Sequence, residues 1–404
     1  MTFLPASSDA SDFMRQTRGS TTIRIPNRSI RSFVIACLAL AGCAEASGPA
    51  TNDHAQRVLI AGTEEGAIVV DFDWRGIIRR TGPRFVSHGP TVLNGRGEII
   101  TVGRMPDSVT IMAGLDVETG LELWRTAITQ GTTPVLKDGI ELGAAMISAN
   151  PSKPEVFMYR AAQNGVNGIV GYNYDSRRVT RFVGPVGNRF RAMTSTPATL
   201  AHPEGCLVMG LDADTDPGPG FNVRAFLHVV CGTTYAQRDS VSIDLPSRTI
   251  LQMEMTGNGR ELIVMTDLEL LKLDAATMQV RLRASRPMSA PFFLSRTTGR
   301  VIVPDVGSSV VASTGLIYIL DAQLELASVI DLRVMPFNER PLGILGAEES
   351  RDGRWLYVVG GVPRDGPLYG PERTHVLVID KTTGLVVDRV HLGTFGASRA
   401  VMMP

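Results

Sequence analysis

The sequence predicts an all-β fold, and three observations lead to this expectation. After Arg57 there is almost no helical periodicity. Short apolar runs such as AIVVDF (67–72) and WLYVVGG (355–361) alternate instead with clusters of Gly, Asn, Asp and Pro, a pattern typical of strands and turns. The same pattern also recurs along the chain, which indicates a ring or stack of similar units.

The repeated unit contains a strand that ends in a short polar side chain, then a turn, then an amphipathic strand. A diverged copy ends near Val230, and the other copies end at Asp71, Asp116, Asn173, Asp274, Asp321 and Asp380. Steps of 44 to 59 residues suit four-stranded blades, so we predict a β-propeller over 57–404 with seven blades, six or eight being the alternatives. We interpret the aspartates as turn caps rather than as catalysts.

The two ends of this region predict how the ring closes. The first unit begins with RVLIAG (57–62), which matches a second strand of the repeat and lacks an innermost strand before it. The chain ends in SRAVMMP (398–404), which matches an innermost strand with nothing after it. We therefore expect 398–404 to complete the blade that starts at Arg57, which protects the edge strands.

Two segments carry a resemblance to a known repeat family. LDVETG (115–120) and VIDKTTGLVVDRVHLG (378–393) resemble YVTN-type and quinoprotein-like β-propeller repeats, with the YVTN tetrapeptide blurred to LYVVGG (356–361). LELWRT (121–126) is similar to the tryptophan motif of quinoprotein propellers, in one blade only. The resemblance implies the architecture of residues 57–404 and says little about their function.

The N-terminal region has the pattern of a bacterial secretory signal. Five arginines and no acidic residue occupy residues 14–31, and the apolar run FVIACLALAG (33–42) follows. Ten apolar residues are too few to span a bilayer, which needs about 20. Asp9 and Asp12 fit a signal poorly, so translation starts at either Met1 or Met14.

The end of this signal, Leu40-Ala41-Gly42-Cys43, resembles the lipobox of bacterial lipoproteins. The resemblance implies removal of residues 1–42, a lipid on Cys43 and a flexible tether over 43–56, with an ordinary signal peptide as the alternative. Ala44, in place of an inner-membrane retention Asp, implies sorting to the outer membrane. We therefore expect a lipid-anchored protein of the bacterial cell envelope, facing the periplasm or the cell surface.

Two cysteines remain in the predicted propeller. CLVMG (206–210) and AFLHVVC (225–231) flank a turn-rich segment, and a hairpin centred near Gly218 sets Cys206 opposite Cys231. Cross-strand Cβ atoms lie about 4.5–5.5 Å apart, close to disulfide geometry, and export favours oxidation. A disulfide is the expectation, with two buried thiols as the alternative.

Few residues point to metal or catalytic chemistry. Asp212, Asp214 and Asp216 begin like a calcium loop, but Pro217 replaces its glycine and Val223 its final Glu. We interpret the run as a solvated turn, with calcium as the alternative and no other cofactor expected. No histidines share a metal-ligand spacing, and GxSxG, Walker and GxGxxG motifs in their required contexts are missing from the sequence.

The functional expectation is binding. Lys plus Arg (40) equals Asp plus Glu (40), so no overall basic field exists to hold nucleic acid. Loops at a propeller's channel mouth commonly bind, and four residues of such loops are candidates for a recognition rim: Arg191, Arg364, Tyr369 and Arg373. We expect a platform for an envelope protein or glycan without catalysis of its own; the alternative is a lactonase-like or quinoprotein-like enzyme with its site in the channel.

Overall fold

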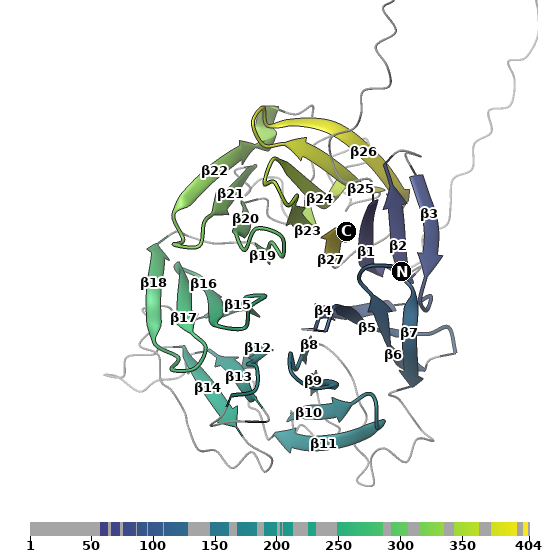
Figure 1. The fold of residues 1–404 in the computed structure, drawn as a ribbon, viewed down its shortest axis with the longest axis vertical. Coiled ribbons are helices and arrows are strands. Elements are labelled where there is room, and N and C mark those ends of the chain that lie inside the picture. Colours follow the sequence, from purple (N-terminus) through teal and green to yellow (C-terminus); the bar gives the residue numbers. More distant parts are fainter. Residues whose placement is uncertain are drawn as a thin grey trace, which may run out of the picture. The chain divides into compact units, whose positions relative to one another are not determined.

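The strands form seven sheets around a central axis (Figure 1). The structure, a computed structural model, describes residues 57–63, 66–72, 76–85, 87–94, 96–107, 109–127, 146–160, 168–183, 190–199, 203, 205–212, 225–231, 249–285, 292–305, 315–334, 343–362, 373–393 and 399–402. The expected signal (1–42), Cys43 and the tether (43–56) lie outside these residues. Among the described residues no helix is long and apolar enough to cross a bilayer.

Each sheet is an antiparallel blade. The strands of blades 1 to 3, from the axis outwards, are β27 (Arg399–Met402), β1 (Arg57–Thr63), β2 (Gly66–Asp71) and β3 (Gly76–Thr81); β4 (Ser87–Leu93), β5 (Glu98–Arg104), β6 (Thr110–Asp116) and β7 (Glu122–Ala127); and β8 (Met146–Ala149), β9 (Glu155–Arg160), β10 (Gly168–Asn173) and β11 (Arg178–Val183). The expected copies of the repeat are therefore confirmed here, each as the third and fourth strands of a blade.

Blades 4 to 7 continue the same order. Their strands are β12 (Phe190–Ser195), β13 (Cys206–Leu211) and β14 (Phe226–Cys231); β15 (Ile250–Met255), β16 (Glu261–Thr266), β17 (Glu269–Asp274) and β18 (Val280–Ser285); β19 (Phe293–Leu294), β20 (Val301–Asp305), β21 (Leu316–Leu320) and β22 (Leu326–Asp331); and β23 (Gly343–Glu349), β24 (Trp355–Val362), β25 (Arg373–Asp380) and β26 (Leu385–Gly393). A short 3-10 helix, η2 (Leu332–Val334), follows β22. Blade 4 has three strands within the described residues, and the place of a fourth, 232–248, lies outside them.

The fold is a seven-bladed β-propeller, as the repeat predicts. The buried apolar residues in the described part of the chain do not form one central core; they form seven clusters, each lying between two neighbouring blades. Both faces of each sheet are therefore buried, which explains why the middle strands are nearly continuous apolar runs. In β5, for example, every residue but the last is buried.

The ring closes where the sequence predicts. β27 pairs with β1 in antiparallel register, with Val58 opposite Met402 and Ala61 opposite Arg399. The last strand of the chain is thus the innermost strand of the first blade (Figure 1). Behind this closure, Val58 and Ile60 of blade 1 pack in one apolar cluster with Trp355 and Tyr357 of blade 7.

The turn after the third strand depends on its polar end residue. The Asp116 side chain accepts hydrogen bonds from the backbone N–H of Thr119 (2.6 Å) and from its hydroxyl (2.7 Å), and Gly120 follows with φ +67°. The Thr119 hydroxyl first, and then its backbone N–H, hold the pKa of Asp116 below its ordinary value. The interpretation of these aspartates as turn caps is therefore confirmed at this position.

Glycine is not required in every copy of this turn. The residue four positions after the cap has positive φ in blades 3 and 5 as well, although it is Arg177 (φ +57°) in one and Met278 (φ +56°) in the other. In blade 5 the Thr277 backbone N–H, followed by the Arg281 guanidinium, lowers the pKa of Asp274 to about 2. The hydrogen bonds to the cap thus hold a non-glycine residue at positive φ, a conformation that glycine adopts more easily. A sequence pattern that requires glycine at this position therefore misses these two turns.

Deleting residues 398–404 is expected to lower the free energy of unfolding by about 4 kcal/mol. The deletion removes the ladder between β27 and β1, at roughly 1 kcal/mol for each of its pairings. Denaturant unfolding of the full chain and the deletion variant measures the loss. As a control, deleting only residues 403–404, which lie beyond β27, should leave the midpoint unchanged. An unchanged midpoint for the longer deletion would contradict closure by this strand.

Candidate functional site

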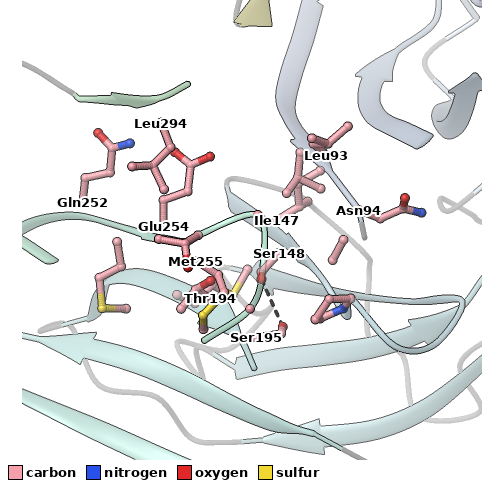
Figure 2. A pocket seen from close by; sticks show the side chains of 18 of the residues that line it. Leu93, Asn94, Ile147, Ser148, Thr194, Ser195, Gln252, Glu254, Met255 and Leu294 are labelled. Carbon is pink, nitrogen blue, oxygen red and sulfur yellow. Dashed lines mark hydrogen bonds between the residues drawn. The ribbon is translucent and has the colours of Figure 1, made fainter. Parts of the chain in front are cut away.

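The innermost strands of blades 2 to 6 surround a cavity of about 690 Å³ in the central channel (Figure 2). β4, β8, β12, β15 and β19 each contribute residues to its wall, as do the turns that follow these strands. These five inner strands are short, with two to seven residues each, and consecutive residues of β8 and of β12 line the cavity. The propeller therefore builds this site from segments that are far apart in the sequence.

The wall of the cavity is mainly apolar and neutral polar. Its larger apolar side chains are those of Val92, Leu93, Met146, Ile147, Met193, Leu251, Met253, Met255 and Leu294. Its hydroxyl groups belong to Thr91, Ser148, Thr194, Ser195, Thr256 and Ser295. The Ser148 and Ser195 hydroxyls lie 3.0 Å apart and join β8 to β12, as the dashed line in Figure 2 shows. These groups can hydrogen-bond to a ligand or to each other, but they carry no charge.

Gln252 in this wall serves the packing between blades. Its carboxamide donates to the Phe292 carbonyl (2.9 Å) and accepts from the Phe292 backbone N–H (3.0 Å). The side chain thus imitates a strand partner and links blade 5 to blade 6. Glu254, two residues further along β15, is partly buried and lines the same cavity (Figure 2).

Arg191, a candidate recognition residue from the sequence, lines the channel. Its guanidinium forms an ion pair with Asp212, and about half of its side chain is exposed (51%). The other oxygen of the Asp212 carboxylate accepts a hydrogen bond from the Ile250 backbone N–H (3.2 Å) at the start of β15. Asp212 therefore connects blade 4 to blade 5 and orients Arg191.

The other predicted site residues are not brought together by the described part of the chain. Arg364, Tyr369, Asp214 and Asp216 lie outside the described residues, and so does the side chain of Arg373, whose backbone begins β25. Calcium binding by the aspartate run stays a prediction. No group of three or more His, Cys, Asp or Glu side chains suited to a metal ion occurs among the described residues.

The structure brings together one histidine pair that the sequence spacing hides. His375 of β25 lies directly opposite His391 of β26, and their ring centres are 4.9 Å apart. Metal-binding motifs contain histidines a few positions apart in the sequence. His375 and His391 are sixteen positions apart and meet because the register of β25 and β26 places them opposite each other. Only the length of the hairpin between the two strands could have revealed it beforehand.

Cys206 and Cys231 are joined by a disulfide. They are opposite each other in the register of β13 and β14, with their Cα atoms 4.3 Å apart. The hairpin expected from the sequence has this register. The bond ties the second strand of blade 4 to the third at the end of the sheet where Thr196 accepts a hydrogen bond from the Cys206 backbone N–H (2.9 Å).

Two buried glutamates hold blade 7 against blade 6 at one end of the channel. Glu348 accepts hydrogen bonds from the Ser295 hydroxyl (2.6 Å) and from the Arg296 backbone N–H (3.0 Å). Glu349 is fully buried and forms ion pairs with Lys381 and with Arg300 (3.4 Å). Burial raises the pKa of the Glu348 carboxyl above its ordinary value, against the opposing effect of these hydrogen bonds. Adjacent acidic residues in a sequence suggest a surface, and only the blade contact explains their burial.

These features define a seven-bladed β-propeller with a largely uncharged central cavity. No family model and no curated protein matches the sequence. Among solved structures, the chain is similar to the Cps50 (Swd1) β-propeller domain of Myceliophteria thermophila, at 13% identity over 75% of this chain and 85% of that one, with a TM-score of 0.45.

Two further solved structures are similar at the same level. The dihydro-heme d1 dehydrogenase NirN, in complex with DHE, shares 13% identity over 86% of this chain and 74% of that one, with a TM-score of 0.46. The Dos1 propeller shares 11% identity over 80% of this chain and 78% of its own length, with a TM-score of 0.44. The fold of the present chain is established by its own strand order, and its function has to be argued from its own residues.

Glu348→Gln is expected to gain stability relative to the wild type as the pH rises above about 4.5. A raised pKa in the folded state means that the carboxyl stabilises the fold at low pH and loses this contribution as it ionises. Glutamine stays neutral and keeps an oxygen to accept the bonds from Ser295 and Arg296. Urea unfolding at several pH values measures the difference.

Asp274→Asn is the matched control, and its stability relative to the wild type should change with pH in the opposite direction. The pKa of Asp274 is lowered to about 2, so its contribution is present near neutral pH and is lost as the pH falls towards that value. A difference between Glu348→Gln and wild type that stays constant with pH would show that Glu348 does not titrate differently in the folded protein.

Proposed function

We propose that this protein is a lipid-anchored binding platform of the bacterial cell envelope, with its ligand-binding site in the central channel. The observation that supports binding is the cavity wall, in which apolar side chains and hydroxyl groups greatly outnumber charged ones. Pockets that recognise ligands commonly have this composition, an apolar surface with a few polar groups that set orientation. The partner is expected to be an envelope protein or glycan that inserts a small, mostly uncharged group.

Enzymatic activity has less support from the same wall. A hydrolase or oxidoreductase site needs an acid–base pair, a metal or a nucleophile beside a base, close together at one point. Within the described cavity lining, the charged groups are Arg191, Glu254 and Arg296, and Arg191 is paired with Asp212. A channel enzyme of the lactonase-like or quinoprotein-like type therefore remains the alternative.

A photo-crosslinking amino acid at Leu251 should capture the ligand or partner in cells. Leu251 lines the cavity and is 42% exposed, so the substitution changes a surface that a bound group would touch without disturbing the packing between blades. Leu326 on the outer strand of blade 6 is the matched control, at 45% exposure. We expect one defined adduct at Leu251 and none at Leu326, read by mass spectrometry of the purified protein.

Other outcomes of this experiment count against the channel as a binding site. Equal labelling at the two positions would indicate random contacts, and the lack of any adduct at Leu251 would place binding elsewhere. Turnover of lactones or of quinone-linked substrates by the purified protein would favour the enzyme alternative.

Cys43→Ser should abolish lipid attachment in a bacterial host. The lipobox chemistry modifies the thiol of the residue directly after the cleavage site, which is Cys43. An alkyne fatty acid incorporated by the cells should therefore label the wild type and not this variant. Cys37→Ser, in the same apolar run, is the control and should keep the label. A Cys43→Ser protein that still carries the label would refute lipidation at this position.

A further inference from the structure

The turns between first and second strands lie at the same end of the propeller as those between third and fourth strands. Backbone hydrogen bonds join the two kinds of turn in four blades: Val117 N–H to Gly97 O (3.0 Å), Tyr174 N–H to Pro154 O (3.0 Å), Ala275 N–H to Arg260 O (2.9 Å) and Lys381 N–H to Arg354 O (3.0 Å). We call this end the turn face. The opposite end carries the connections between second and third strands and those between blades.

On the turn face, the turns after the innermost strands touch one another around the channel. Ala198 of blade 4 donates its backbone N–H to the Ser152 hydroxyl of blade 3 (2.7 Å). A Cβ added to Gly259 of blade 5 would lie 2.3 Å from the Pro197 ring of blade 4. Several of these inner turns also line the cavity, so they form a rim around it on this face.

The exposed charges of this rim are nearly all positive. Five arginines of the inner turns are exposed, and we call them the arginine ring: Arg96, Arg260, Arg296, Arg351 and Arg354. Asp352 is the exposed acidic residue among the described inner turns, and its carboxylate accepts hydrogen bonds from the Ser350 hydroxyl and the Arg354 backbone N–H (3.1 Å). The outer turns hold exposed acids such as Glu118, Asp175 and Glu325 together with the exposed Arg177, and Asp175 lies 3.8 Å from the guanidinium of Arg96. A chain with no net charge thus concentrates cations around one channel mouth.

The N-terminal end of the propeller also lies on the turn face. Arg57 begins β1, a second strand, and its guanidinium contacts Asp71 at the end of the third strand (3.1 Å). The expected tether between Cys43 and Arg57 has thirteen residues, which reach at most about 45 Å when extended and roughly 20 Å on average when flexible. A lipid on Cys43 would therefore hold this face near the bilayer rather than the opposite one.

We propose that the arginine ring docks the turn face on anionic lipid headgroups. Exposed arginines close to a negatively charged bilayer each strengthen binding about five-fold. The channel mouth on this face then points at the membrane, and the opposite face, with its longer connections, points away. This orientation rests on the lipid anchor of the proposed function. The affinity of the arginine ring for anionic lipid is independent of that anchor.

The test uses the chain from residue 44 onwards without its lipid, because the closed ring of blades is contained within 57–402. Its binding is measured by co-sedimentation with vesicles of phosphatidylcholine, with and without phosphatidylglycerol, at low and high salt. We expect binding only to the anionic vesicles, weakened by salt, and about 100-fold weaker after the triple substitution Arg96→Gln, Arg260→Gln and Arg351→Gln.

A matched triple variant removes the same charge away from the ring. Arg84→Gln, Arg104→Gln and Arg389→Gln change exposed arginines outside the turn-face rim and should leave vesicle binding close to that of the parent. Thermal unfolding of both triple variants checks that the propeller is intact.

Three results would overturn the proposal. One is no binding to anionic vesicles at low salt, and another is an equal loss in the two triple variants. The third is ring-dependent binding to a soluble anionic polysaccharide such as dextran sulfate without binding to vesicles, which would assign the ring to a glycan. None of these results affects lipidation of Cys43 or crosslinking at Leu251, so a failure of docking is distinguishable from a failure of the proposed function.

Discussion

The structure depends on the burial of both faces of every blade by its two neighbours. Seven apolar clusters lie between blades, and none of the seven is complete without side chains from two sheets. A linear array of such sheets would expose one apolar face at each end, so only a closed ring satisfies all of them. This constraint explains why the two ends of the domain meet in a single blade, where β27 supplies the strand that β1 lacks.

Polar side chains at the blade contacts complement this apolar packing. Asp212, Gln252 and Glu348 each hydrogen-bond to backbone N–H groups of a neighbouring blade, and so fix the position of one sheet against the next. A buried polar group costs free energy unless it is paired, so these contacts favour one arrangement of the blades. These side chains therefore contribute to the assembly of the ring.

The ring also gives the molecule two different ends. Antiparallel strands place alternate connections at opposite ends, so the short polar turns gather on one face and the longer connections on the other. The short turns bring arginines next to the channel axis and acidic caps further out, although the chain as a whole has no net charge. The proposed lipid anchor would place the turn face at the membrane and leave the opposite face for a partner.

The sequence by itself determined the class of fold, the closure and the register of the cysteine hairpin, and it predicted seven blades with six or eight as alternatives. These features follow from patterns that can be read along the chain. Apolar runs alternate with turn residues, a polar cap precedes each repeated turn, and cross-strand pairing is set within one hairpin. Only the tertiary structure decided which residues meet between blades or line the channel, such as Arg191 with Asp212 and Glu348 with Ser295. These contacts join segments from different strands or blades, and they leave no periodic signal because each blade contact uses different side chains. The left-handed Arg177 and Met278 show the same limit, since capping hydrogen bonds hold a conformation that the residue types alone do not favour.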